Sequence, residues 1–579
     1  MTRPPLARCI VPALLVLIVA GPFTIHHLVN DDPTATLVTL GQERLVIMTP
    51  HGDQIRQAFA HAFNVWRHRR GEPAVYFDYR TMGGTSDLRK QVFSQFAALV
   101  RHQQENDGIG VDLFFGGGPY EHDKLADGIT VQRDGTKVSI PLSVPCDIPS
   151  AALAAAFPEE WIGGEPLLRR DSATGHPLWI GTALSSFGIV SNHDVLAMLN
   201  LPLPRTWADL GDARYAGWVA MADPGHSGSV AATCHTVLQH KGWHRGWEIL
   251  RRIYANARYF ASSASKVPLD VSAGEAAAGM CIDFYGRYQA GAMPDERIAY
   301  VDPRRDRTDG APLETAVTAD PISILRGSPS PKLARTFVRW VLSTEAQRLW
   351  QRHPGTEGGP LRHALRRVPV RRDLFTTKEM ALWTDPANPF LSAKPLPPGM
   401  PNFYRLVAPL SHAMAIDIHD DLKAAWRAIH DHRDDNCRRH MLTLFDAMPP
   451  NTEDTDQDAG ITIPWPPDLS SEVVATIIAD PTNPRYAEVI ETIGSFAQRL
   501  KQRYTTPGST RNWNDEERLR RDRLAWTRFF RSNYREIVAI SSNAATCSST
   551  PSASASKSYP PSKVETIRPS QWRTAAAVK

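Results

Sequence analysis

Residues 45–66 read LVIMTPHGDQIRQAFAHAFNVW, and this stretch decides the fold class. It opens with four apolar residues, which end at the polar turn Pro50-His51-Gly52. Apolar residues then recur at helical spacing as one stripe: Ile55, Phe59, Ala62, Phe63 and Trp66. A short apolar strand that leads through a tight turn into an amphipathic helix is the repeating unit of an α/β sheet.

The same unit recurs downstream. A second strand at 74–79 leads through Gly83-Gly84-Thr85-Ser86 into an amphipathic helix, and a third strand at 111–115 ends in Gly116-Gly117-Gly118. Three such strands predict a parallel sheet with helices on its faces. The pattern returns in a second block, and the strand at 322–325 leads the chain back to the first sheet. We therefore predict an α/β fold with two lobes joined by crossing strands.

The composition of later segments suggests the domain boundaries. Residues 380–450 hold helical patches, 451–468 are acidic and rich in proline, 472–540 are helical and rich in arginine, and a Ser, Ala, Thr and Pro bias follows. We expect 1–29 to be a signal peptide or N-terminal membrane anchor, 40–190 with 301–370 to form lobe 1, and 191–300 to form lobe 2. A helical extension at 371–450, a linker and helical C-terminal region at 451–540 and a disordered tail at 541–579 complete the chain. Residues 40–375 are expected to fold and bind alone.

The N-terminus carries the pattern of an export signal. Arg3 and Arg8 precede an apolar run at 10–20, which is a little short for a full membrane span and is followed by no clean A-x-A site. A removed signal peptide and an uncleaved anchor both stay open. We expect a periplasmic or extracellular protein, soluble or tethered to the membrane by this segment. No second long apolar stretch follows, which excludes a multi-span transporter or channel.

Charge and cysteine content exclude other classes. The 579 residues include 65 Lys+Arg and 61 Asp+Glu, a formal net charge of +4, so a protein that coats nucleic acid is not indicated. The six cysteines are scattered without a C-x-x-C, which indicates neither a zinc knuckle nor a disulfide framework.

The candidate site residues lie in polar turns where strands lead into helices. Ligands bind at that edge of open α/β sheets, because helix N-termini present unpaired N–H groups and a positive dipole end there. Glycine permits close backbone approach, and hydroxyls donate or accept hydrogen bonds. Each turn alone also suits a helix cap, but three at equivalent positions favour a binding cleft. The candidates in these turns are Gly84, Thr85, Ser86, Gly117, Gly118, Ser227, Gly228 and Ser229.

Known catalytic motifs are missing or incomplete. The sequence contains no P-loop and no H-E-x-x-H. Gly225-His226-Ser227-Gly228-Ser229 follows a strand and opens a helix as a nucleophile elbow does, but Ser229 fills the place where the elbow needs glycine. We therefore expect no enzyme, and an exported serine hydrolase that uses Ser227 is the alternative.

Five motifs in order along the chain carry a specific resemblance. They are Thr49-Pro50-His51, Gly83-Gly84-Thr85-Ser86, the stretch 112–118, the stretch 223–229 and the stretch 279–285. In this order they resemble the extracellular solute-binding proteins of ABC importers, and most of all the ferric-iron group with the type II periplasmic-binding-protein fold. The similarity covers about residues 44–370.

The resemblance implies a two-lobed receptor with parallel-rich sheets that closes on a small solute. Such a receptor delivers the solute to ABC permease subunits, and it needs neither catalytic turnover nor a resident cofactor. We further expect a monomer. A receptor that reports ligand occupancy to a sensor is another interpretation of the same fold.

The resemblance also suggests ligand-binding residues. His51 and Tyr285 stand where the ferric binders have a histidine and the second of two adjacent tyrosines, but Phe284 replaces the first tyrosine and cannot ligate a hard cation. If the ligand is ferric iron, the set would be His51, Tyr285 and Asp283. The hydroxyls and glycine N–H groups suit instead an anionic organic or phosphate-bearing solute. Each of the three also suits a structural role, as a helix cap, a cleft wall and a turn cap respectively.

Overall fold

The computed structural model describes residues 43–393 except 134, 294 and 309, and then 403–449, 483–485, 488–489 and 516–542. The predicted signal peptide or anchor at 1–29, most of the region 451–540 and nearly all of the predicted tail lie outside the described residues. Among the helices that the structure describes, none combines the length and the apolar character that a membrane span requires.

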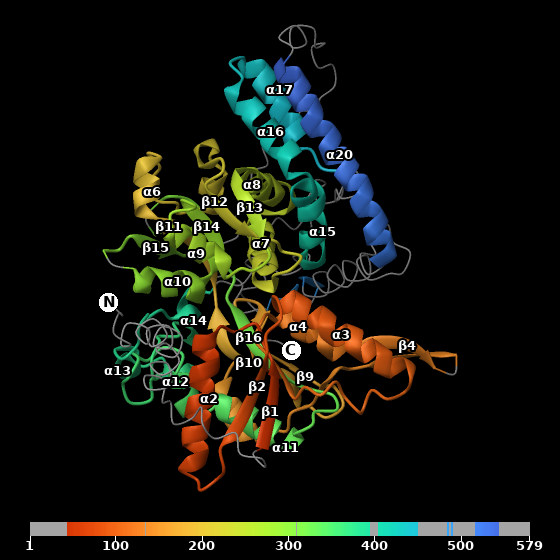
Figure 1. Cartoon of the computed structure of the whole chain (residues 1–579), viewed down its shortest axis with the longest axis vertical. Coiled ribbons are helices and arrows are strands. Elements are labelled where there is room, and N and C mark those ends of the chain that lie inside the picture. The colour runs from red at the N-terminus through yellow and green to blue at the C-terminus, as the bar shows by residue number, and fades with distance from the viewer. Residues whose placement is uncertain are drawn as a thin grey trace, which may run out of the picture.

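Lobe 1 is built on an eight-stranded mixed sheet with the main order β17-β10-β16-β3-β1-β2 (Figure 1). The βα units run parallel, whereas β16 runs antiparallel to its neighbours β3 and β10. The strands are β1 (Glu43–Met48), β2 (Val75–Arg80), β3 (Leu113–Phe115), β6 (Ser143–Val144), β9 (Leu168–Arg170), β10 (Pro177–Ser185), β16 (Thr318–Leu325) and β17 (Val368–Pro369). Two small hairpins add β4 (Ile129–Arg133), β5 (Thr136–Ile140), β7 (Trp161–Ile162) and β8 (Glu165–Pro166).

Helices cover both faces of this sheet. Because strand side chains alternate, Leu45 and Ile47 of β1 pack against α2 and α11, whereas Val46 and Met48 pack against α3. In α2, Ile55, Phe59 and Phe63 of the predicted stripe are buried. The lobe 1 helices are α2 (Asp53–His68), α3 (Thr85–Arg101), α4 (Pro119–Asp127), α5 (Ser150–Ala156), α11 (Pro331–Val341) and α12 (Thr344–Arg348).

Lobe 2 has a five-stranded sheet in the order β13-β12-β14-β11-β15. Its strands are β11 (Phe187–Asn192), β12 (Val219–Ala222), β13 (Ala257–Ala261), β14 (Ala278–Ile282) and β15 (Ile298–Val301). Its helices are α6 (His193–Met198), η1 (Trp207–Gly211), η2 (Ala213–Tyr215), α7 (Gly228–Lys241), α8 (Trp243–Asn256), α9 (Lys266–Ser272) and α10 (Asp283–Ala292). The α/β class with two lobes is thus confirmed, with antiparallel crossing strands in otherwise parallel sheets.

The lobe boundaries differ from those expected from the sequence. The run at 182–190 reads as one extended segment, but β10 ends at Ser185 in the first sheet and β11 begins at Phe187 in the second. The sequence gives no sign of this crossing because every residue of both strands is buried. On the way back, Thr315 still bonds the backbone of Phe187, and the chain rejoins the first sheet only at Thr318.

The helical extension expected at 371–450 divides between the two lobes. The short segments η3 (Arg372–Leu374), α13 (Thr377–Met380) and α14 (Pro389–Ser392) stay with lobe 1, where Glu379 binds Arg348 and Arg352. The later helices α15 (Tyr404–Met414), η4 (Ile416–Ile418), α16 (His419–Asp431), α17 (Asp435–Asp446) and α20 (Glu516–Ser542) pack on lobe 2 (Figure 1).

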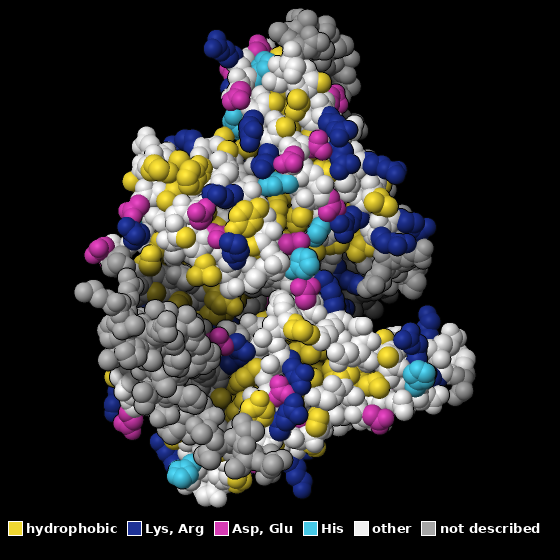
Figure 2. All heavy atoms as spheres, viewed as in Figure 1, with side chains coloured by type: hydrophobic (Ala, Val, Ile, Leu, Met, Phe, Trp, Pro, Cys, Tyr) yellow, Lys and Arg dark blue, Asp and Glu magenta, His cyan; other side chains and the backbone are white. Residues whose placement is uncertain are grey.

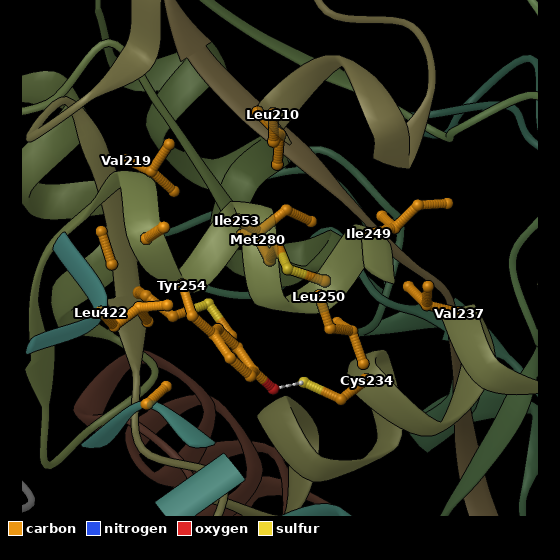
Figure 3. Close-up of a cluster of buried hydrophobic side chains, with 14 of the residues drawn as sticks. Leu210, Val219, Cys234, Val237, Ile249, Leu250, Ile253, Tyr254, Met280 and Leu422 are labelled. Carbon is orange, nitrogen blue, oxygen red and sulfur yellow. Dashed lines mark hydrogen bonds between the residues drawn. The ribbon is translucent and has the colours of Figure 1, made fainter. Parts of the chain in front are cut away.

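These later helices, which we call the C-terminal bundle, share one hydrophobic core with the lobe 2 sheet. Figure 3 shows Leu422 of α16 beside Tyr254 of α8, whose hydroxyl lies 3.3 Å from the Cys234 sulfur of α7. Trp426 of α16 donates a hydrogen bond to Asn256 at 2.9 Å. This continuity speaks against the expectation that residues 40–375 form a self-sufficient unit.

Candidate functional site

A cavity of about 870 Å³ lies between the two lobes. Residues from lobe 1, lobe 2 and the C-terminal bundle line it, and Figure 2 shows a recess between the lobes on one face of the molecule. A space of this size suits a small organic molecule, because ligand pockets in proteins range from about 300 to 1,000 Å³.

The first turns of several helices face this cavity. Lobe 1 contributes the starts of α2, α3 and α4, and lobe 2 contributes those of α7 and α10. The residues that precede α2, α3 and α4 are Gly52, Gly84 and Gly118, and no side chain caps any of the three helices. The first N–H groups of a helix lack intrahelical partners, so these three ends offer positive dipole ends and donors to a ligand, except that Pro119 at the start of α4 has no N–H.

A buried ionic cluster lies in the cavity wall. Arg367 is 1% exposed, and its Nη1 atom lies 2.8 Å from Oδ2 of Asp320, which is also 2.8 Å from Nε2 of His51. Burial lowers the pKa of His51 despite the nearby carboxylate. Burial alone would raise the pKa of Asp320, but Arg367 and His51 hold it below its usual value. The Nε2 atom of His51 is therefore already paired with Asp320.

Arg367 keeps hydrogen-bonding capacity. Its Nη2 donates to the Ser185 hydroxyl at 2.8 Å and its guanidinium lies 4.2 Å from the centre of the Phe284 ring, while its buried Nε has no partner in the described part of the chain. The sequence offers no local signal for this residue, because its partners Asp320 and His51 are far away along the chain.

The predicted hydroxyls and glycines occupy two environments. Thr85, Gly84, Gly117 and Gly118 line the cavity, and Ser86 does not, because its hydroxyl donates to Oε1 of Glu121 at 2.8 Å. Gly117 has a φ of 102°, and a Cβ there would meet the Thr85 methyl at 2.2 Å, so glycine is required at this position.

The turn before α7 brings the lobes into contact. A Cβ on Gly84 of lobe 1 would come within 2.4 Å of the His226 carbonyl oxygen of lobe 2. Lys90 donates to the Gly225 carbonyl at 2.9 Å, and His226 lies 3.1 Å from Asp87. The lobes are therefore closed on this side of the cavity.

Ser227, Gly228 and Ser229 all line the cavity, and Ser227 caps α7. The Ser227 hydroxyl lies 3.1 Å from that of Ser229 and accepts from the Val230 N–H. Among the hydrogen bonds of the described residues, none joins Ser227 to a histidine. A serine nucleophile needs a base within hydrogen-bond reach, so this geometry gives the hydrolase alternative no support.

The three residues suggested for iron do not converge. Tyr285 and His51 line the cavity. Asp283 faces a separate space of about 40 Å³ with Arg287 and Asp302, and its Oδ1 accepts from the Phe284 N–H at 2.8 Å. Burial raises the pKa of Asp283 to about 6. Within the described part of the chain, no three His, Cys, Asp or Glu side chains lie close enough together to hold a metal ion.

The structure adds residues from outside the predicted turns. Tyr404 of α15 lines the cavity, donates to the Gly228 carbonyl at 3.1 Å and packs on Tyr120 of lobe 1 with ring centres 4.2 Å apart. It lies beyond the region of the sequence resemblance, so no sequence motif indicated that it would lie here.

Comparisons with known proteins agree with the architecture. Residues 169–356 match the family model described as bacterial extracellular solute-binding protein. The phosphoglycerate transport regulatory protein PgtC of Salmonella typhimurium is 29% identical over 170 residues, which cover 29% of this chain and 40% of that protein. An uncharacterized protein of Haemophilus influenzae is 29% identical over 171 residues, covering 28% of this chain and 44% of the relative. The match thus spans less than half the length of these relatives.

Solved structures include similar chains. AfuA from Actinobacillus pleuropneumoniae, a periplasmic binding protein with fructose-6-phosphate bound, is 17% identical with a TM-score of 0.44, and the alignment covers 67% of this chain and 98% of AfuA. Iron-bound HitA from Pseudomonas aeruginosa is 18% identical with a TM-score of 0.40, covering 61% of this chain and 92% of HitA. The family match confirms the resemblance for residues 169–356, which include the motifs at 223–229 and 279–285, and this part of the chain is a bacterial extracellular solute-binding domain.

Proposed function

We propose that this protein is the solute-binding component of an ABC importer and captures a small anionic organic solute between its lobes. The observation that carries the proposal is the meeting of three glycine-preceded, uncapped helix starts, α2, α3 and α4, in one cavity with the buried Arg367. Backbone N–H groups at helix starts bind phosphate and carboxylate groups well. The Arg367 guanidinium is paired with Asp320 and contributes N–H donors in the cavity wall.

The solute in this proposal bears a phosphate or a carboxylate. The name of the Salmonella relative, which refers to phosphoglycerate transport, supports that class. Ferric iron is the less favoured solute, because Asp283 faces away from the cavity and His51 is paired with Asp320. Binding and release need no resident cofactor and no turnover. The working form is a monomer outside the cytoplasm that docks on permease subunits, either free or tethered by its N-terminal segment.

Calorimetric titration tests the anion proposal. Phosphoglycerate, inorganic phosphate and ferric citrate are titrated into the purified protein, and a phosphate-bearing compound is expected to bind. Thr85→Val, Ser227→Ala and Ser229→Ala should each weaken anion binding by about 0.5–3 kcal/mol, the range for one hydrogen bond to a neutral or charged group. Ser86→Ala is the matched control, because that hydroxyl faces Glu121. Binding of ferric citrate alone, abolished by Tyr285→Phe, would contradict the proposal.

A second candidate function is ligand sensing, in which the closed form docks on a signalling receptor. The word "regulatory" in the name of the Salmonella relative favours it. Cross-linking in intact cells with and without phosphoglycerate distinguishes the two, because an importer component is expected on permease subunits and a sensor component on a membrane receptor.

A further inference from the structure

Two side chains on α7 line the cavity with unsatisfied polar atoms. His235 and Gln239 lie four residues apart, on one face of the helix. His235 is 9% exposed, and neither its Nε2 nor Oε1 of Gln239 has a hydrogen-bond partner among the residues that the structure describes. Buried polar groups in proteins are almost always paired, so a solute in the cavity is a suitable partner for these two groups.

The polar groups around His235 and Gln239 suit a neutral partner that donates hydrogen bonds. Burial lowers the pKa of His235 to about 4, so the ring is uncharged near neutral pH. Next to Gln239, Glu165 of β8 is a second acceptor in the cavity lining, and burial raises its pKa despite a hydrogen bond from Gln239. Hydroxyl groups meet these requirements, because they donate to the amide and carboxyl oxygens and pair with either state of a neutral imidazole nitrogen.

The region lies apart from the starts of α7 and α3, which meet where a Cβ on Gly228 would lie 3.5 Å from Thr85. At 1.5 Å per residue, His235 is about 9 Å and Gln239 about 15 Å along α7 from Ser229. An inorganic phosphate held where α7 and α3 begin cannot reach both. The paired rings of Tyr404 and Tyr120 lie beside this region, and the ring centres of Tyr404 and His235 are 5.8 Å apart.

We infer that His235, Gln239 and Glu165 form a second subsite of the cleft, which binds the hydroxyl-bearing carbon skeleton of the solute while the helix starts hold its anionic group. The solute class is therefore a hydroxylated organic anion rather than a simple anion. This inference rests on the proposed anion-binding function.

Titration of three probes into the full-length protein tests the subsite. The probes are fructose 6-phosphate, 3-phosphoglycerate and inorganic phosphate. Gln239→Leu and His235→Phe should each weaken binding of the hydroxylated probe with the higher affinity by tenfold or more and change inorganic phosphate binding by less than twofold. Arg367→Gln should weaken all three. His240→Gln is the matched control on the same helix, since His240 bonds the Thr236 carbonyl and does not line the cavity.

The outcomes separate the two proposals. Unaltered inorganic phosphate binding shows that a variant is folded, and two independent variants guard against a local packing defect. If wild-type protein binds these anions but the α7 variants weaken every probe equally, or none, the subsite is refuted and the anion proposal survives. If wild-type protein binds none of the three probes, both proposals are refuted.

Discussion

In lobe 1 the sheet is covered by helices of the same lobe, with α2 and α11 on one face and α3 on the other. In lobe 2 the corresponding core also contains residues from α15, α16, α17 and α20, which follow the sheet in the sequence by more than 100 residues. The two lobes share a strand and helix architecture but differ in which segments of the chain complete their hydrophobic cores. A lobe that looks complete by its sheet can still depend on a distant segment for its core.

Deleting the C-terminal bundle should destabilise lobe 2 more than any other change described below. A chain that ends at residue 393 would expose the lobe 2 surface that Val407, Leu410 and Leu422 cover, all three of which are fully buried. We expect lobe 2 to lose cooperative unfolding while lobe 1 keeps it. Hydrogen exchange should show lost protection in β12 and β14 and retained protection in β1 and β3. Equal protection in both sheets would show that lobe 2 is self-sufficient.

Two tryptophan substitutions, one in each core, test the same difference between the lobes. Trp350 in lobe 1 donates to the Thr182 carbonyl, and Trp426 in the bundle donates to Asn256, both at 2.9 Å. Either residue changed to alanine should cost about 3–5 kcal/mol, as for other buried aromatic residues. Urea unfolding monitored by hydrogen exchange should show a lower unfolding midpoint for lobe 1 in Trp350→Ala and for lobe 2 in Trp426→Ala. A Trp426→Ala variant whose lobe 2 unfolds at the wild-type midpoint would argue against a shared core.

The stability of lobe 1 and the stability of lobe 2 with its C-terminal bundle should change with pH in opposite directions. Burial lowers the pKa of His122 in lobe 1 from 6.5 to about 4, so the neutral ring stabilises the fold above pH 6.5. That contribution, about 3 kcal/mol, should be lost as the pH falls from 6.5 to 4.

His412 joins the bundle to lobe 2 through Asp223 at 3.1 Å and also contacts Asp417 at 3.0 Å. Burial opposes its charge, but these carboxylates raise its pKa above the ordinary value. Its contribution is therefore complete below pH 6.5 and is lost as the pH rises through the raised pKa. Denaturant unfolding from pH 4 to 8 should show both trends, and His412→Gln should remove only the alkaline one. A single trend common to both lobes would contradict the assignment.

Removing one hydroxyl at the junction of bundle and cleft should have the smallest effect. Tyr404→Phe loses the hydrogen bond to the Gly228 carbonyl but keeps the ring on Tyr120, so phosphoglycerate affinity should fall by about 0.5–1.5 kcal/mol in calorimetry. Tyr534→Phe is the matched control, because its hydroxyl bonds the Met414 carbonyl inside the bundle at 2.9 Å. The same loss of affinity in both variants would mean that the effect is one of stability alone.

Local patterns were sufficient to predict much of the fold. The apolar stripe of α2 and the glycine turns before α3 and α4 are short-range features, and their residues lie where the patterns indicate. The crossing at Ser186 could not be predicted, because an uninterrupted buried run carries no mark of a change of sheet.

The candidate site was predicted only in part, for a related reason. The turn residues were found from local sequence, but Arg367 joins His51 and Asp320 only through the folded sheet. Asp283 was expected in the cleft, yet its side chain bonds the start of its own helix and faces Arg287 and Asp302. Strand and turn patterns locate a backbone edge but do not fix which way each side chain turns from it.

The shared core of lobe 2 also sets the order in which the protein can fold. Phe530, Tyr534 and Ile537 of α20 are fully buried in that core, although they are synthesised more than 200 residues after β15. A growing chain therefore carries an unfinished apolar surface until α20 leaves the ribosome, and such surfaces bind chaperones. The fold of lobe 2 is therefore completed only after α20 has been synthesised.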